Sequence, residues 1–227
     1  MKVIQRMDYP NTVSKRELER WADGIPRFPD CDPTRPEWQP TPLLTLDLSQ
    51  HGLGKVLVKD ESVNPTGTFK DRMGWEVVPC LYRDWARQQL ANHRYTYEIP
   101  RLSIISSGSA LASLAYWAEK YALPPPSVLV EETKLSKLTA PFKPFLHFKP
   151  ADMRGLIAFG FTGKMTGVTK VSESYLNIAK KVFDDNLVAS EYSGVAGLAG
   201  ALQDAGNGYK VNGPILVINT GKCKLNR

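Results

Sequence analysis

The segment RLSIISSGSALASLAYWAEKYALPPPSVLVEE, residues 101–132, carries the clearest indication of the fold. Its two ends, RLSIISS (Arg101–Ser107) and SVLVEE (Ser127–Glu132), are short apolar runs typical of strands. Between them, ALASLAYWAEKYAL (Ala110–Leu123) is rich in good helix formers, and the proline turn that follows ends the helix. Strand, loop, helix, turn and strand form the crossover unit of a parallel sheet, so the sequence predicts an α/β fold.

Outward from this unit, apolar periodicity predicts further elements in both directions along the chain. They are a strand at KVLVKD (55–60), a helix at 69–91 interrupted near Pro79, a strand at 156–159, an amphipathic helix at 172–185, a closely packed helix at 193–205 and a buried strand at PILVINT (214–220).

Polar loops follow four of these predicted strands. They are NPTGTFKD (64–71), SSGSA (106–110), GFTGKMTG (160–167) and TGKCK (220–224). In open parallel sheets, ligands bind outside the carboxyl ends of the strands, where helix N-termini present free N–H groups. The sequence therefore predicts one ligand site built from these four loops.

Composition limits the class of protein. The 227 residues are 42% hydrophobic and carry a formal net charge of +6, with the basic residues scattered along the chain. Scattered charge argues against nucleic-acid binding and suits small anionic ligands. The three cysteines have no CxxC spacing and the histidines have no metal-ligand spacing, so no metal site is predicted. No apolar run is long enough for a signal peptide or membrane span, which predicts a cytoplasmic protein without membrane contact.

Lys70 is the candidate reactive residue of the first loop. Thr68 as N-cap, with Asp71 three residues on, would place Phe69 and Lys70 in the first turn of a helix. The positive end of the helix dipole and burial in a crevice both favour the neutral, nucleophilic amine, which is suited to forming a Schiff base. A surface lysine whose charge Asp71 offsets is an equally good interpretation of the spacing alone.

The segment KDESVNPTGTFKDRMG (59–74) resembles the lysine motif of the fold-type-II pyridoxal-phosphate enzymes, the tryptophan synthase β superfamily, and is nearest the threonine synthase version. Other segments resemble further motifs of that family in the family's order: residues 39–61 its Thr-Pro-Leu segment and following strand, 105–130 its Ser-Gly-Asn loop and helix, 159–167 its phosphate loop, 190–202 its Glu-Pro-Ser-Gly-Ala helix start and 218–225 its final Thr-Gly loop. The resemblance implies an α/β fold of two domains with the cofactor in the cleft between them. The larger domain would comprise residues 1–72 and 146–227, and a smaller mobile domain residues 73–145.

The resemblance also implies roles for particular residues. Lys70 would form the Schiff base with pyridoxal 5'-phosphate and carry the α-proton of the substrate. Backbone N–H groups of Gly160, Phe161, Thr162 and Gly163 would hold the cofactor phosphate, Ser109 would lie beside the ring hydroxyl, and Thr220 would face the pyridine nitrogen. Ser106, Ser107 and Gly108 would receive the substrate carboxylate.

Several positions depart from the family pattern. Ser109 replaces an asparagine, Thr162 a glycine and Tyr192 a proline. The intervals from Ser109 to Gly160 and from Gly167 to Ser172 are short for the family. Either the chain is a natural contraction or segments are missing from the sequence, and the second interpretation is favoured because residues 133–155 show no coherent period.

The implied activity is elimination or replacement on an amino acid. The leading hypothesis is threonine synthase-like conversion of O-phosphohomoserine to threonine and phosphate, by a homodimer. Alternatives are a serine or threonine ammonia-lyase, a β-replacing synthase of the cysteine or cysteate type, and a degenerate member that keeps the fold as a binding module.

Overall fold

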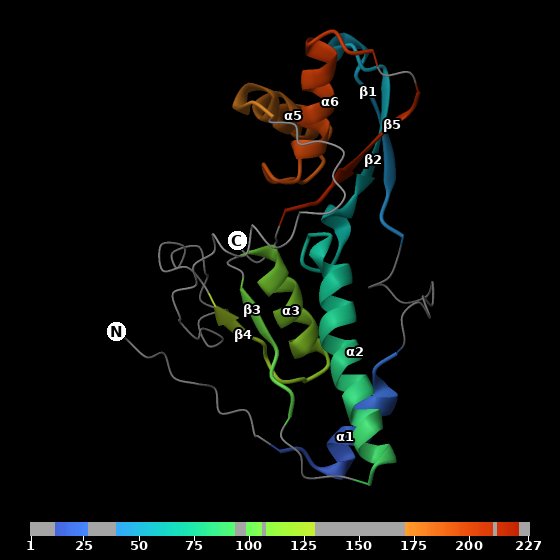
Figure 1. Ribbon diagram of the computed structural model, residues 1–227. Helices are drawn as coiled ribbons and strands as arrows, with labels where there is room; N and C mark the ends of the chain where they lie inside the picture. The colour runs from blue at the N-terminus through green and yellow to red at the C-terminus, as the bar shows by residue number, and fades with distance from the viewer. Residues whose placement is uncertain are drawn as a thin grey trace, which may run out of the picture. The chain divides into compact units, whose positions relative to one another are not determined.

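The structure, a computed structural model, describes residues 12–26, 40–93, 99–105, 108–129, 171–210 and 213–222 (Figure 1). The chain divides into two compact units. Unit 1 comprises residues 1–35, 70–158 and 225–227, and unit 2 comprises residues 36–69 and 159–224. The domain limits predicted from the sequence stay a prediction. Within the described ranges, no helix has the length and apolar character needed to cross a bilayer.

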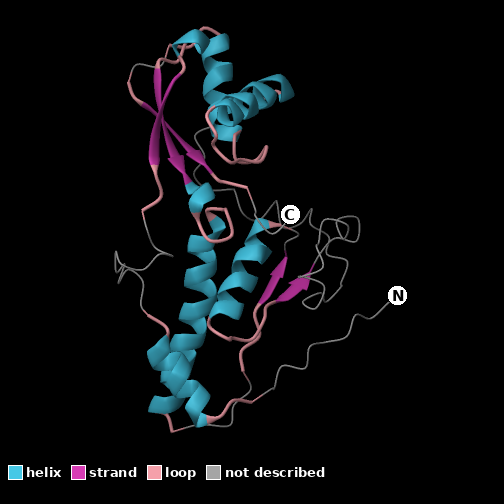
Figure 2. Cartoon of the chain, turned by 180° about the vertical axis from the view of Figure 1, so that it is seen from behind, coloured by secondary structure: helices cyan, strands magenta, loops and turns pink. Residues whose placement is uncertain are grey.

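Unit 2 is built on a sheet of three strands in the order β1-β2-β5. The predicted strands β2 (Lys55–Asp60) and β5 (Ile215–Asn219) are confirmed, and they pair in parallel with Asp60 opposite Asn219. Strand β1 (Leu43–Asp47), which the sequence interpretation did not predict, pairs antiparallel with β2 (Figure 2). The fold is therefore α/β as expected, with an antiparallel edge strand added to the parallel pair.

One face of this sheet forms the core of unit 2. Val56 and Val58 of β2 and Val217 of β5 point into a cluster with Phe183 of α5 (Glu173–Asp185) and Leu198 of α6 (Ala196–Gly206). Both helices were predicted. Burying such side chains contributes about 1.5–3 kcal/mol each, which holds α5 and α6 on the sheet.

The prediction that β5 is a buried strand holds for one face only. Leu216 and Ile218 are 60% and 54% exposed, whereas Val217 and Asn219 between them are buried. A continuous apolar run resembles a strand covered on both sides, but the strand alternates because α5 and α6 cover a single face.

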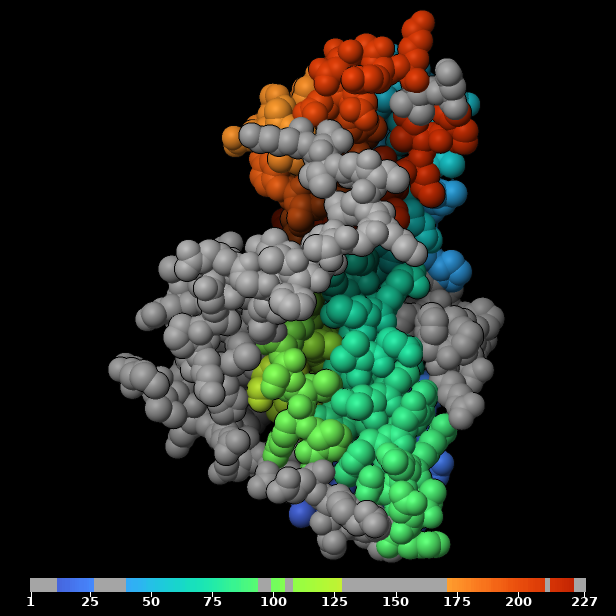
Figure 3. Space-filling model, viewed as in Figure 1, coloured from blue at the N-terminus to red at the C-terminus, as the bar shows by residue number. Residues whose placement is uncertain are grey.

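Unit 1 contains the predicted crossover. Strands β3 (Ser103–Ile105) and β4 (Ser127–Leu129) pair in parallel, joined by α3 (Ser109–Lys120). The helix α3 packs along α2 (Lys70–Ala91), and the two helices lie side by side with their N-terminal ends pointing the same way (Figure 1). The space-filling view shows α2 at the surface beside α3 (Figure 3).

The helix α2 is continuous through Pro79, which corrects the predicted interruption. Proline inside a helix removes one hydrogen bond and costs about 3 kcal/mol. Here Pro79 is buried, and the nearby helix residues Val78 and Tyr82 are fully inaccessible, so packing against the rest of unit 1 offsets that cost.

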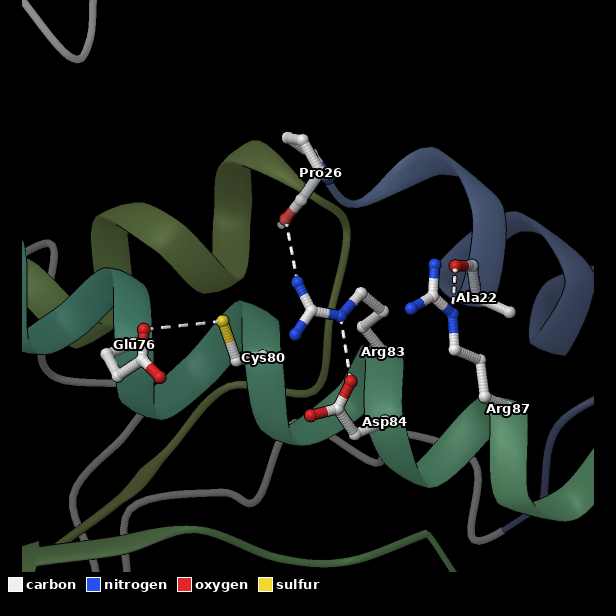
Figure 4. Close-up of polar contacts among 7 residues, drawn as sticks. All are labelled: Ala22, Pro26, Glu76, Cys80, Arg83, Asp84 and Arg87. Atoms are coloured by element: carbon white, nitrogen blue, oxygen red, sulfur yellow. Dashed lines mark hydrogen bonds and ion pairs between the residues drawn. The ribbon is translucent and has the colours of Figure 1, made fainter. Parts of the chain in front are cut away.

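Arginine side chains of α2 attach α1 (Lys15–Gly24), which begins with a capping box of Ser14 and Glu17. Arg87 Nε donates to the carbonyl of Ala22 at 3.0 Å, and Arg83 donates to the carbonyl of Pro26 at 2.9 Å (Figure 4). The Arg87 bond satisfies a carbonyl in the last turn of α1 that has no helical partner, and the Arg83 bond holds the segment that follows the helix.

Candidate functional site

The loop Asn64–Thr68 joins the end of β2 to the lysine. Gly67 N–H donates to the carbonyl of Asn64 at 2.8 Å, closing a turn that has Pro65 second and Gly67 fourth. Those residue types at those positions are typical of a type I turn. The Asn64 side chain closes the loop from inside, because its Nδ2 donates to the Thr68 carbonyl at 3.1 Å.

A buried carboxylate supports this loop. Glu61, in the short helix η3 (Glu61–Val63), accepts from Asn64 Nδ2 at 2.8 Å and from the hydroxyl of Thr41 at 2.7 Å. Glu61, Thr41 and Asn64 are each at most 7% exposed. Charge-assisted hydrogen bonds in such a site are stronger than neutral ones, so Glu61 fixes the conformation in which Asn64 holds the loop.

The loop lies against the turn that follows β5. Phe69 N–H donates to the carbonyl of Thr220 at 3.2 Å, and Lys222 N–H donates to the carbonyl of Gly67 at 2.9 Å. An isolated antiparallel bridge joins Thr68 to Gly221. These contacts all lie within unit 2, and they attach Thr220 to the residue that immediately precedes Lys70.

Gly221 makes this approach possible. Its φ is +90°, and a Cβ there would lie 2.1 Å from the carbonyl oxygen of Gly67 and 3.1 Å from the Cα of Ser62. Both neighbours are backbone, so they cannot turn aside as a long side chain would. Only glycine permits this turn at this separation.

Asn219 connects the ends of the two parallel strands. Its Nδ2 donates to Asp60 Oδ1 at 2.8 Å and to the carbonyl of Ala189 at 2.9 Å, and its Oδ1 accepts from Gly221 N–H at 3.0 Å. Asp60 Oδ1 also accepts from Ser62 N–H at 3.0 Å. Asn219 is fully buried, so this one amide aligns β2, β5 and the start of the loop before α6.

Lys70 is the first residue of α2 and is half-buried. The helix therefore begins at Lys70, one residue later than expected, because Thr68 takes part in the bridge to Gly221. Within unit 1, the Lys70 carbonyl accepts from the Ser113 hydroxyl at 2.8 Å. Asp71 is buried, and its carbonyl accepts from Trp117 Nε1 at 2.9 Å.

Gly108 and Ser109 form the N-terminus of α3, also in unit 1. Gly108 is the N-cap residue and Ser109 the first helical residue. The Lys70 carbonyl is hydrogen-bonded to Ser113, one turn after Ser109, so the N-terminal ends of α2 and α3 belong to the same end of unit 1. That end presents the positive ends of two helix dipoles, which favours anions.

Six predicted site residues lie outside the described part of the chain. They are Ser106, Ser107, Gly160, Phe161, Thr162 and Gly163. The predicted roles of Lys70, Gly108, Ser109 and Thr220 stay predictions, although the structure gives each a place. Tyr192, which departs from the family pattern, is 55% exposed, and its hydroxyl donates to Asn177 Oδ1 at 2.9 Å.

Sequence reasoning missed Asp60, Asn219, Glu61, Ser113 and Trp117. A usable signal existed for two of them. Strict alternation from Val56 and Val58 places Asp60 on the core side of β2, and alternation from Val217 places Asn219 on the core side of β5. Polar residues on the core side of two neighbouring strands need each other as partners.

A protein-family model matches part of the chain. Residues 34–141, just under half of the chain, match the family described as pyridoxal-phosphate dependent enzyme. This range contains the lysine loop, α2, α3 and both strands of the crossover. No curated protein sequence matches the chain at a significant level.

Solved structures of low sequence identity are similar over most of the chain. O-ureido-L-serine synthase is 14% identical, with 82% of this chain and 90% of that chain covered and a TM-score of 0.48. Diaminopropionate ammonia lyase from Escherichia coli in its apo form is 13% identical, with coverages of 94% and 91% and a TM-score of 0.47. The same enzyme in complex with an aminoacrylate-PLP azomethine intermediate is 15% identical, and this chain covers 52% of it with a TM-score of 0.36. These TM-scores are too low to support a conclusion about activity.

The described residues fit a cofactor with an aldehyde and anionic groups. Within unit 1, the half-buried Lys70 offers an amine, Ser109 offers a hydroxyl, and the N-termini of α2 and α3 favour anions. Among these described ranges, no cluster of His, Cys, Asp or Glu could hold a metal ion. The groups of unit 1 are compatible with an organic cofactor bound through an amine.

Proposed function

We propose that the chain is a pyridoxal-phosphate-dependent enzyme acting on a small amino acid, with Lys70 as the residue that binds the cofactor covalently. The observation that carries the proposal is the loop Asn64–Phe69 held on the Thr220–Gly221 turn, with Lys70 next in the chain. The family match across residues 34–141 supports the cofactor. When bound, pyridoxal phosphate supplies the electron sink for bond breaking at the α-carbon.

The protein's own groups have distinct tasks in this proposal. Lys70 would hold the cofactor by condensation of its amine with the aldehyde, which would release water. Once the substrate amine displaced it from the aldehyde carbon, the freed Lys70 amine would accept and return the α-proton of the substrate. The Thr220 hydroxyl would face the ring nitrogen and, unlike a carboxylate, would not favour its protonation. Ser109 would lie beside the ring hydroxyl, Gly160–Gly163 would hold the phosphate, and Ser106, Ser107 and Gly108 would bind the substrate carboxylate.

Among possible reactions, we propose elimination or replacement, and specifically a threonine synthase-like reaction on O-phosphohomoserine. This choice rests on the sequence of the lysine loop, which is nearest that branch, and on the net charge of +6, which suits a phosphorylated substrate. The alternatives are an ammonia-lyase acting on serine or threonine and a β-replacing synthase. A homodimer and a cytoplasmic location are part of the same proposal.

The cofactor proposal is tested by adding pyridoxal phosphate to the purified protein and to Lys70→Ala. A visible absorbance band should develop in the first and not in the second. Borohydride reduction followed by peptide mass spectrometry should then place the added mass on Lys70. Lys181→Ala is the matched control, since this lysine is 76% exposed and pairs with Asp185 on α5. Attachment that persists unchanged in Lys70→Ala would exclude Lys70 as the cofactor-binding residue.

The reaction is tested separately. Phosphate release from O-phosphohomoserine is compared with keto-acid release from serine and threonine, under identical conditions. Phosphate release alone supports the threonine synthase-like reaction. Keto acid without phosphate release would replace it with an ammonia-lyase, and attachment of the cofactor with neither product would favour a binding module.

A further inference from the structure

The first turn of α2 is held from the side by α3, and this contact concerns the candidate reactive lysine directly. Ser113 donates to the carbonyl of Lys70, and Trp117 donates to the carbonyl of Asp71. Ser113 and Trp117 are both fully inaccessible to solvent. Side-chain donors from a neighbouring helix thus bind two successive carbonyls in the turn that carries the amine.

Gly74 makes both contacts possible. It lies one turn after Lys70, and a Cβ there would lie 2.0 Å from Ser113 Oγ and 3.0 Å from Trp117 Cδ1. Glycine in a helix interior costs about 1 kcal/mol relative to alanine. The absent side chain at this position leaves the space in which the Ser113 hydroxyl and the indole reach the carbonyls of the preceding turn.

We propose that Ser113 and Trp117 are positioning residues for Lys70, fixing the direction in which its side chain leaves the helix, with Gly74 providing the space for both. The Lys70 carbonyl belongs to the rigid peptide plane that follows the lysine Cα, so a hydrogen bond to that carbonyl restrains the orientation of the lysine. This inference rests on the proposed role of Lys70. It assigns α3 a task in the chemistry besides the anion binding expected at its N-terminus.

The positioning by Ser113 and Trp117 should affect the rate of reaction at Lys70. A lysine side chain has several rotatable bonds, and only the conformers that leave the helix in the right direction bring the amine to the aldehyde. Loss of a restraint on the backbone at its origin spreads the amine over more positions. Small misplacements of a reacting group reduce rates on the order of tenfold to a hundredfold.

The chain offers matched controls for both side chains. Ser190 and Trp21 are buried, and neither Ser190 Oγ nor Trp21 Nε1 has a hydrogen-bond partner among the described residues. Ser190→Ala therefore makes the same chemical change as Ser113→Ala without removing such a bond. Trp21→Phe stands in the same relation to Trp117→Phe, since Trp21 packs on Tyr82 and Trp85 through its ring.

The test measures two quantities on the full chain. The first is the rate constant for attachment of pyridoxal phosphate, followed by absorbance, with the modified residue identified after borohydride reduction. The second is amide hydrogen exchange of residues 70–75 in the protein before the cofactor is added. Ser113→Ala and Trp117→Phe should each slow attachment about tenfold and speed exchange in this segment, whereas the two control variants should change neither.

The outcomes separate the inference from the proposed function. If the unmodified protein attaches the cofactor at Lys70 and the α3 variants behave like their controls, the positioning role is wrong and the role of Lys70 stands. If the unmodified protein does not attach the cofactor at Lys70, the proposed function fails and this inference fails with it. Should Ser113→Ala not fold, Trp117→Phe provides the same comparison at the adjacent carbonyl.

Discussion

Replacing Gly221 with alanine tests whether the close approach of two backbone segments holds the lysine loop. The added Cβ meets two separate difficulties. One is the backbone conformation, because φ is +90° and the left-handed region costs a residue with a Cβ about 1–2 kcal/mol. The other is contact, because the carbonyl oxygen of Gly67 would lie 2.1 Å away, and relieving that contact requires the two segments to separate by roughly 1 Å.

The separation has a defined cost. The Phe69 to Thr220 and Lys222 to Gly67 hydrogen bonds both join the two segments, and each is worth about 0.5–1.5 kcal/mol net. Gly221→Ala should therefore lower the free energy of unfolding by about 2–5 kcal/mol in total. About 1–3 kcal/mol of that loss comes from the separation of the segments.

Gly208→Ala isolates the conformational part. Gly208 has a φ of +84°, and no atom lies within 4 Å of the position of its Cβ. Its replacement should cost only about 1–2 kcal/mol. Urea unfolding of both variants gives the comparison, with cofactor attachment at Lys70 as a second measurement. Equal losses of stability in the two variants would refute the argument that Gly221 is required by its approach to Gly67.

Three further perturbations address the rest of the described structure. Asn219→Asp places a second carboxylate at the 2.8 Å contact with Asp60, so the variant should be less stable than the original protein by about 2–4 kcal/mol at neutral pH. This loss of stability should shrink as the pH falls and the carboxylate pair binds a proton. A stability that varies with pH in parallel with that of the original protein would contradict this prediction. Gly74→Ala should lower the free energy of unfolding by about 1–3 kcal/mol, although alanine has the better helix propensity. Gly200→Ala in α6 should be neutral or stabilising, because its new Cβ meets Val171 at an ordinary 3.9 Å. Thermal unfolding that ranks the two variants the other way would refute the expected clash between a Cβ at position 74 and Ser113. Burial raises the pKa of the Cys80 thiol, so the rate at which iodoacetamide alkylates Cys80 in the native protein should rise at a higher pH than the rate for free cysteine. Mass spectrometry of the Cys80 peptide follows the reaction. A pH profile like that of free cysteine would show an accessible thiol.

Local pattern was sufficient for most elements of the fold. The strand at Lys55–Asp60 was predicted with its observed limits, and the helix at 172–185 differs by one residue at its start. These segments have strong periodicity of their own, and the same side chains that show it make the core. The crossover of β3, α3 and β4 was also recognised, because proline and a helix-forming composition mark its internal boundaries.

Tertiary context decided what local pattern could not. Pro79 indicates a break by itself, but α2 packs on both α1 and α3, and that burial outweighs one missing hydrogen bond. The contacts of Ser113 and Trp117 with the first turn of α2 could not be predicted, since they join residues more than forty positions apart. Alanine-rich helices normally indicate close packing, but the sequence does not specify which carbonyl a buried serine will reach.

The identity of the residue before Thr220 follows from the hydrogen bonds that it makes. The side chain at position 219 must donate twice, to Asp60 and to the carbonyl of Ala189, and accept once, from Gly221 N–H. An amide of this length does both, whereas a carboxylate has no donor when ionised and an apolar residue has neither function. The placement of Thr220 is therefore determined by its neighbour and by the backbone of the turn.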